Sequence, residues 1–171
     1  MSERRIRKAT PEDAAAIAGI HARGWQWGYR GLLPAEFLAT LTAAEGVTRW
    51  SERLADPSRR TWLVEDASGA VAFLACGPSR EEDVPAGSGE VYALYEEEFA
   101  AGTGAARALM THAVDALRIG GAQLAVLWVL AENTRARRFY EAAGWRADGK
   151  TKTVEHRAGL LREVRYGRSI P

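Results

Sequence analysis

The sequence has little cysteine, no long apolar run and no excess of charge of one sign. Cys76 is the only cysteine, which rules out an intramolecular disulfide and argues against a cysteine-rich zinc site. No segment approaches the roughly 18 apolar residues of a membrane-spanning helix, and the N-terminal MSERRIRKAT has no apolar signal region. The 23 basic residues nearly balance 22 acidic ones, so no global field favours nucleic acid or an anionic membrane. We therefore expect a cytoplasmic protein with neither a nucleic-acid nor a membrane partner.

The chain also lacks internal repeats, low-complexity stretches and linker-like shifts in composition. Its 171 residues are 47% hydrophobic, enough for a core that buries about two-thirds of the surface of the unfolded chain. A single domain over residues 1–171 is therefore expected. The three histidines show no metal-ligand spacing, so no metal is expected either.

The first half of the chain combines helical and extended patterns. Thr10, Pro11 and Asp13 mark a helix start, since threonine can cap the first amides, proline suits the first turn, and an acid there favours the helix dipole. A second helical region is expected over 34–55, with an interruption near Gly46. Extended segments are expected at residues 4–8, 61–66, 68–77 and 89–96. Turn residues separate the last three segments, which predicts an antiparallel meander.

The second half begins with a strand, a helix and a buried strand in succession. Apolar residues recur at helical spacing over 106–117. The uninterrupted apolar run LAVLWVL at 124–130 is typical of a strand buried on both faces. Together with the strand at 89–96, these segments predict a parallel βαβ unit.

The last part of the chain repeats the order of helix and then strand. Asn133 can cap a helix with apolar residues at helical spacing, and Gly144 suits its C-terminal end. Two more strands are expected, one near Trp145 and one at 162–167. With the meander and the βαβ unit, they predict a mixed sheet.

Gly102 and Gly104 lie in the turn AAGTGAA, between the strand and the helix of the βαβ unit. Small residues there let successive backbone N–H groups form an anion-binding nest at a helix start, where the helix dipole is positive. A Gly-x-Gly turn alone is a weak signal, and a softened turn that binds nothing is the alternative. Neither the Rossmann pattern G-x-G-x-x-G nor a P-loop lysine is present.

Two longer segments resemble a known family. GEVYALYEEEFAAGTGAARALM, followed by LWVLAENTRARRFYEAAGW, is similar to the acetyl-CoA core of the GCN5-related N-acetyltransferases (GNAT family). GWQWGYRGLLP at 24–34 is similar to the first-helix region of the family's small-molecule branch. The resemblance implies an α/β (α+β) fold, with a mixed, mostly antiparallel central sheet, a parallel splayed strand pair and helices on both faces. It also implies acetyl-CoA as co-substrate.

The resemblance places acetyl-CoA on the glycine turn and on the strand before it. Backbone groups of Leu94 and Tyr95 are implied to hold the pantetheine arm and to polarise the thioester carbonyl. Asn133 is implied to lie near the same arm, a role compatible with capping its helix. Pyrophosphate contacts are implied for five successive small residues: Gly102, Thr103, Gly104, Ala105 and Ala106.

The turn departs from the family pattern at two points. Ala101 stands where the family favours arginine or glutamine, so one phosphate donor is missing. Glu96 and Glu98 take positions that are more often apolar and proline. We therefore expect weakened affinity for acetyl-CoA. We interpret Glu97 and Glu98 as a solvated shoulder of the turn, and a charged loop without a role is the alternative.

Candidate catalytic residues also follow from the resemblance. Most amines are protonated near pH 7, so acetyl transfer needs a proton acceptor. Glu90 matches the family's strand acid, and an exposed strand-end glutamate without a role is the alternative. Tyr140 matches the acid that protonates the departing CoA thiolate, and a core aromatic beside Phe139 is the alternative. Three aromatic residues are implied to line a pocket for a small cationic amine, or else to pack the core and a lid: Trp25, Trp27 and Tyr29.

Two classes of function are compatible with these features. The first is an acetyl-CoA-dependent N-acetyltransferase that acts on a small-molecule or peptide amine by direct attack in a ternary complex. The alternative is a non-catalytic acyl-CoA-binding or partner-binding module on the same scaffold. Only the enzyme releases free CoA thiol when an amine is present. A homodimer is one option that the sequence leaves open.

Overall fold

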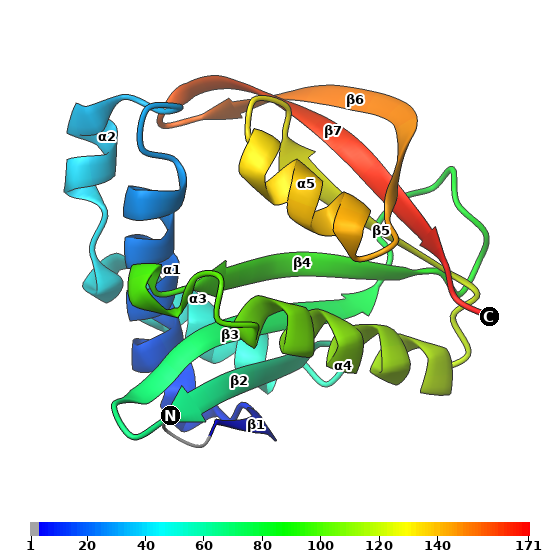
Figure 1. The fold of residues 1–171 in the computed structure, drawn as a ribbon, viewed down its shortest axis with the longest axis horizontal. Helices are drawn as coiled ribbons and strands as arrows, with labels where there is room; N and C mark the ends of the chain where they lie inside the picture. Colours follow the sequence, from blue (N-terminus) through cyan, green and yellow to red (C-terminus); the bar gives the residue numbers. More distant parts are fainter. Residues whose placement is uncertain (1–3) are drawn as a thin grey trace.

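The computed structural model describes residues 4–171, so residues 1–3 of the predicted domain and of the charged N-terminal segment lie outside the description. Within this range the chain forms one mixed sheet with helices on both faces (Figure 1). The strands are β1 (Arg5–Lys8), β2 (Arg60–Asp66), β3 (Gly69–Pro78), β4 (Gly89–Glu96), β5 (Leu124–Leu130), β6 (Arg146–His156) and β7 (Gly159–Ser169). The α-helices are α1 (Ala14–Gly28), α2 (Ala35–Thr40), α3 (Ala43–Ala55), α4 (Ala105–Ile119) and α5 (Thr134–Ala142).

The strands of residues 4–171 lie in the order β1-β2-β3-β4-β5-β7-β6. Every neighbouring pair is antiparallel except β4 and β5, which are parallel. This confirms the mostly antiparallel sheet, the meander of β2 to β4 and the βαβ unit. The parallel pair is in register only over residues 89–91 and 125–127, and the two strands then separate. The sheet therefore splits between the C-terminal halves of β4 and β5.

Two apolar layers attach the helices to the sheet. Successive side chains of a strand point to opposite faces, and β3 shows this alternation directly. Phe73 and Ala75 belong to the cluster that packs α1 and α3. Leu74 and Cys76 belong to the cluster that packs α4 and α5. The central strands are thus covered on both faces, and the position of each helix relative to the split is set by this packing.

The predicted starts of two helices are confirmed, at Thr10 and at Asn133, although the Thr10 side chain does not itself cap an amide. The Thr10 amide donates to the Asp13 carboxylate (2.8 Å) at a short 3-10 turn, Pro11–Asp13, that leads into α1. Asn133 caps α5 by accepting a hydrogen bond from the Ala136 amide (3.1 Å). These bonds satisfy amides that have no partner inside the helix.

The predicted helical region at 34–55 is divided at a different place from the one expected. The break falls at Leu41 and Thr42, between α2 and α3, and Gly46 lies inside α3. A β-carbon at Gly46 would lie 3.2 Å from the Ala18 side chain. Gly46 therefore allows α3 to approach α1 closely and does not end a helix.

Candidate functional site

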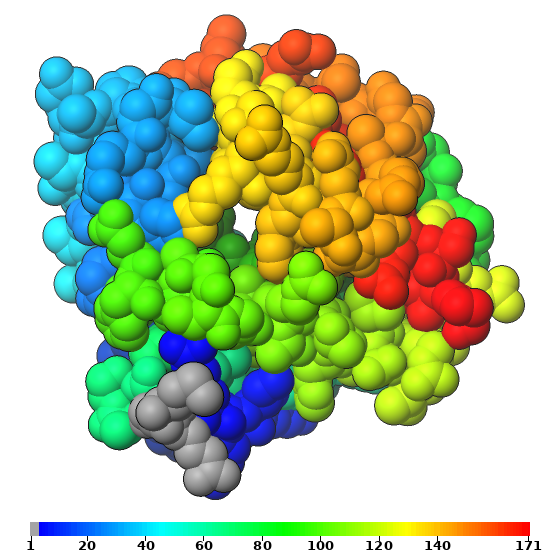
Figure 2. All heavy atoms as spheres, in the orientation of Figure 1, coloured from blue at the N-terminus to red at the C-terminus, as the bar shows by residue number. Residues whose placement is uncertain are grey.

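A cleft of about 690 Å³ opens where β4 and β5 separate, a volume typical of small-molecule sites. Figure 2 shows it as a hollow near the centre of the molecule, among atoms of α1, α4 and α5. We call one part of the cleft the glycine half; it contains Gly102, Gly104, Ala106, Asn133, Arg135 and Tyr140. We call the other part the aromatic half; it contains Trp25, Tyr29, Glu90, Trp128, Lys152 and Glu163.

The glycine turn has a backbone that only glycine adopts readily. Gly102 has φ +73° and Gly104, the N-cap of α4, has φ +93°. A β-carbon at either position would meet no described atom within 4 Å. Backbone conformation, not crowding, therefore requires glycine here. The space over the first amides of α4 stays open toward the cleft.

The five small residues of the turn do not all face the cleft. Gly102, Gly104 and Ala106 line it. Ala105 is buried in the core beneath α4. The Thr103 hydroxyl donates its proton to the Ala100 carbonyl and accepts a hydrogen bond from Arg4. That hydroxyl is already used inside the protein, so the turn offers backbone amides more readily than a side-chain donor.

The three acids before the turn have different surroundings. Glu97 is buried and accepts hydrogen bonds from two guanidinium nitrogens of Arg23. The shorter bond joins Arg23 Nη2 and Glu97 Oε1 at 2.6 Å. The predicted solvated shoulder is therefore wrong for Glu97, because the Glu97 amide is bonded to the Val71 carbonyl and the side chain turns toward α1. Glu98 is exposed and pairs with Arg30 at 3.2 Å, as a solvated residue would.

Glu96 is the acid that borders the cleft. Its Oε1 lies 3.6 Å from Arg135 Nη2. Its Oε2 is buried and no residue among 4–171 forms a hydrogen bond to it. Burial raises the pKa of Glu96 above its ordinary value, while Arg135, the Ala106 amide and Arg4 act in the opposite direction. The Glu96 carboxylate, which lacks a close ion pair and a full set of hydrogen bonds, thus lies beside the open amides of α4.

Leu94 and Tyr95 lie on β4 beyond the point where it leaves β5. There β4 is paired with β3 alone, through Leu74 and Phe73. The edge of β4 that faces β5 has no strand partner within the described chain, so its backbone groups border the cleft. The Tyr95 hydroxyl accepts a hydrogen bond from Trp25 Nε1 (2.9 Å), which makes this side chain part of the wall.

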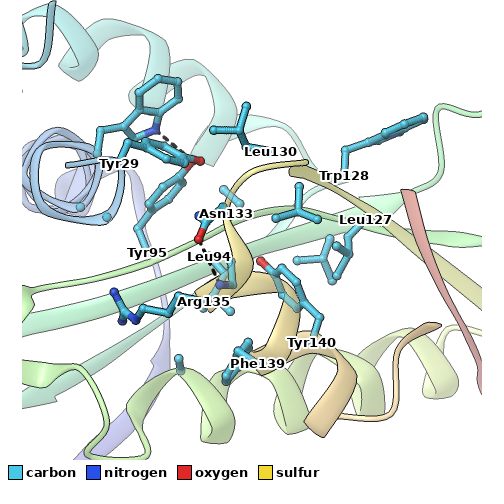
Figure 3. A pocket seen from close by; sticks show the side chains of 18 of the residues that line it. Tyr29, Leu94, Tyr95, Leu127, Trp128, Leu130, Asn133, Arg135, Phe139 and Tyr140 are labelled. Carbon is cyan, nitrogen blue, oxygen red and sulfur yellow. Dashed lines mark hydrogen bonds between the residues drawn. The ribbon is translucent and has the colours of Figure 1, made fainter. Parts of the chain in front are cut away.

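Tyr140 reaches the cleft from the second turn of α5, as Figure 3 shows. Its ring contacts Phe139 edge to face, with centroids 5.4 Å apart. Burial raises the pKa of Tyr140 above its ordinary value, so the phenol stays protonated near neutral pH. No residue among 4–171 hydrogen-bonds to its hydroxyl. The side chain therefore combines a packed ring with a free proton donor at the centre of the site.

Glu90 is not the exposed strand-end residue of the alternative interpretation. Its side chain is 1% exposed, and the Arg80 guanidinium donates hydrogen bonds to both carboxylate oxygens. The Arg80 amide adds a third hydrogen bond at 2.9 Å. Arg80 itself is 61% exposed and also faces the Tyr92 ring, 4.7 Å from its centroid. Glu90 is thus a buried, fully paired carboxylate in the wall of the cleft.

The three predicted aromatic residues all line the cleft but separate into two places. Trp25 and Tyr29 contact each other edge to face at 4.7 Å in the aromatic half. Trp27 instead donates from Nε1 to the Glu96 carbonyl (2.8 Å) and lies under the Arg135 guanidinium. The structure therefore places Trp27 beside the glycine turn.

Sequence reasoning missed several residues of the cleft. Trp128, on β5, has the Lys152 ammonium 4.1 Å from its ring centroid. Lys152 in turn pairs with Glu163 at 3.4 Å. Arg135 was missed because an arginine at the start of a helix carries no signal by itself. The only hint for Trp128 was an aromatic residue inside an otherwise aliphatic run.

Two further observations concern residues 4–171. They contain no group of three His, Cys, Asp or Glu side chains placed to hold a metal ion. In the same range no helix combines the length and the apolar character needed to cross a bilayer.

Comparisons with known proteins give a consistent result. Residues 25–145 match the model of the acetyltransferase (GNAT) family. The chain is 30% identical over 129 residues to the uncharacterized N-acetyltransferase YuaI of Bacillus subtilis, covering 75% of this chain and 72% of that protein. It is 41% identical over 97 residues to a mycothiol acetyltransferase of Beutenbergia cavernae, covering 57% of this chain but only 31% of that protein. Its fold is similar to PaiA N-acetyltransferase from Thermoplasma acidophilum, solved in complex with coenzyme A, with a TM-score of 0.71, 15% identity, and 98% and 99% of the two chains covered.

Proposed function

Because the chain belongs to the GNAT acetyltransferase family, we propose that it transfers an acetyl group from acetyl-CoA to a primary amine of a small molecule or peptide, by direct attack in a ternary complex. One observation carries the proposal. The cleft extends from the open amides of α4, past the unpaired edge of β4, to the aromatic half, and Tyr140 stands in the glycine half at its border with the aromatic half. A thioester bound in one half can thus meet an amine bound in the other.

The glycine half suits acetyl-CoA as co-substrate. Positive-φ glycines leave the first amides of α4 uncovered, and a helix N-terminus attracts phosphate. Gly102, Gly104 and Ala106 would face the pyrophosphate, with Thr103 and Ala105 contributing backbone groups only. The β4 edge at Leu94 and Tyr95 offers hydrogen-bonding groups to the pantetheine arm, and Asn133 lies on the opposite wall. A protein of the same fold, PaiA N-acetyltransferase, has been solved in complex with coenzyme A, which supports coenzyme A as the ligand.

The reaction needs one bond to form and one to break. The amine nitrogen attacks the thioester carbonyl carbon, and a backbone N–H of β4 stabilises the oxyanion that develops. As the carbon–sulfur bond breaks, the Tyr140 phenol gives its proton to the thiolate sulfur. Its raised pKa and lack of a protein partner support this role. The proton that the amine loses passes to Glu90, directly or through a water.

The aromatic half suits a small cationic amine. Trp25, Tyr29 and Trp128 provide ring faces and edges, which attract ammonium groups. Trp27 lies beside the glycine turn, so we assign it to the acetyl-CoA side of the cleft. The name of the mycothiol acetyltransferase, which matches 57% of this chain, supports an acceptor of small-molecule size.

The pairing of Glu90 with Arg80 favours a second candidate, a non-catalytic acyl-CoA-binding or partner-binding module, because both oxygens of this carboxylate already accept hydrogen bonds from Arg80. Both candidates bind CoA. The deciding experiment incubates the protein with acetyl-CoA and a panel of amines and follows free thiol with a thiol-reactive dye. Amine-dependent thiol release supports the enzyme. CoA binding without release for every amine supports the module.

A further inference from the structure

Three residues form a bridge across the cleft, which we call the Arg135 clasp: Arg135, Glu96 and Trp27. Arg135 starts on α5, and its Nη2 lies 3.6 Å from Glu96 Oε1 at the end of β4. Its Cζ lies 4.0 Å from the centroid of the Trp27 ring on α1. In Figure 2, yellow atoms of the α5 region meet blue atoms of α1 at the edge of the hollow, and Figure 3 shows Arg135 extending below Tyr95. The clasp joins the two sides of the sheet split.

The ion pair inside the clasp is incomplete. At 3.6 Å the two groups lack the short, two-pronged geometry that arginine makes with a well-placed carboxylate. The Arg135 side chain is 57% exposed, and Glu96 Oε2 has no partner among residues 4–171. The Trp27 ring holds the guanidinium in place without using any of its N–H donors. Arg135 therefore keeps unused donors in the cleft that the start of α4 also lines.

We propose that Arg135 binds the pyrophosphate of CoA, supplying from α5 the cation that the turn lacks at Ala101, and that Glu96 is the counter-ion that the phosphate displaces. The inference rests on the proposed function. Guanidinium and phosphate match in geometry and bind through paired hydrogen bonds. A phosphate that reaches Arg135 also gains the α4 amides, which a side chain fixed to β4 uses only in part. The acid beside the turn then has a role: it holds Arg135 until the cofactor arrives.

The clasp also predicts a proton change. A second anion near Glu96 favours its protonated form, and burial already raises the pKa of this carboxyl. The charged groups that face Glu96 are Arg135 from α5 and Arg4 before β1, α4 adds the Ala106 amide, and Trp27 of α1 is neutral. Pyrophosphate binding should thus take up a proton and tighten as the pH falls. Dephospho-CoA is the probe for this measurement, because it lacks the 3′-phosphate that titrates in the same range.

The test measures the affinity of the whole chain for CoA, dephospho-CoA and pantetheine by calorimetry. Arg135→Gln should weaken CoA and dephospho-CoA equally, by about tenfold or more, since a charge-assisted hydrogen-bond pair is lost. Pantetheine should bind unchanged, and the salt dependence of CoA binding should become flatter. Arg138→Gln is the matched control, because Arg138 lies on the same helix and is exposed. Arg135→Lys, which keeps the charge, should fall between the two.

Glu96→Gln completes the test, because it removes the competing anion while keeping the shape of the side chain. It should tighten dephospho-CoA binding and remove the strengthening at low pH. Equal affinities for Arg135→Gln and Arg138→Gln would overturn the inference, and so would a loss confined to CoA, which would assign Arg135 to the 3′-phosphate. A loss in Glu96→Gln as large as that in Arg135→Gln would show that Glu96 supports the site and does not compete. If the unmodified protein binds no CoA, the proposed function itself fails.

Discussion

The two halves of the cleft differ in how their polar groups are satisfied. In the glycine half, polar groups stand open: the first amides of α4, the Tyr140 hydroxyl and Glu96 Oε2 have no full set of partners within residues 4–171. In the aromatic half the charges are paired, Glu90 with Arg80 and Glu163 with Lys152. Buried polar groups without partners are costly. A ligand in the glycine half would therefore supply hydrogen-bond partners that the protein itself lacks there. An amine in the aromatic half would instead meet charges that are already paired with each other.

Because of this difference, the glycine half indicates the type of its ligand more clearly than the aromatic half does. Open amides at a helix start and a loosely paired guanidinium favour an anionic ligand. Paired charges between aromatic rings specify size and shape more than sign. Changes in the glycine half should alter acetyl-CoA binding or turnover directly, and changes in the aromatic half should act mainly through broken pairs.

The largest effect is expected for Tyr140→Phe, which keeps the ring but removes the proton at the junction of the halves. Turnover should fall about 100-fold, at the low end for general acid catalysis because a thiolate is a tolerable leaving group. CoA affinity should not change. Since burial raises the pKa of Tyr140, the unmodified enzyme should keep this acid up to at least about pH 10, the ordinary value for tyrosine. Steady-state rates and calorimetry check both points, and full turnover would make Tyr140 a packing residue.

The next effect is expected for Gly104→Val in the glycine half. A valine at φ +93° is strained, and its side chain would enter the open space over the α4 amides. Affinity for CoA should fall more than about tenfold, or about 1.4 kcal/mol, because the side chain occupies the space that the phosphate needs; the backbone strain itself lowers stability in this variant and in its control. Gly121→Val is the control, since Gly121 has φ +89° and equally open surroundings at the other end of α4. Similar losses of CoA affinity in both variants would reject the turn as the phosphate site.

A smaller effect is expected for Glu90→Gln in the aromatic half. If Glu90 takes the proton of the amine, turnover should fall about tenfold, most strongly at low pH where more of the amine is protonated. Arg80→Gln breaks the same ion pair but keeps the carboxylate, so it should lower stability and spare most of the turnover. Rates per folded molecule, with folding followed by thermal melting, separate the two outcomes. Equal losses of turnover would mean that only the pair matters.

The smallest effect is expected for Ala101→Arg, which restores the residue that the family favours. A second guanidinium on the turn should tighten CoA binding by about 1 kcal/mol, or roughly fivefold. If Arg135 already supplies a cation, the gain should be larger in the Arg135→Gln background than in the unmodified chain. Calorimetry at low salt measures both gains, and Ala101→Gln controls for the added bulk. No gain in either background would mean that position 101 points away from the phosphate.

Much of the fold was readable from local signals. Asn133 and Gly104 mark helix starts through their own chemistry, and the apolar run at 124–130 identifies a doubly covered strand. The break at Leu41 was missed because Gly46 is a helix breaker by propensity, and only contact with Ala18 explains why a glycine is placed inside α3. Local preference is a weak guide where tertiary packing decides.

The sequence by itself determined the type of each element, the family and the positions of the candidate residues, because periodicity, caps and motifs depend on neighbours along the chain. Only the tertiary structure decided which charges meet. Glu97 pairs with Arg23, and Glu96 pairs with Arg135, across segments that are distant in sequence. These pairs depend on where α1 and α5 pack on the sheet. Burial of apolar side chains sets that packing, and it is non-directional, so the local sequence does not indicate which charged residues it will bring together.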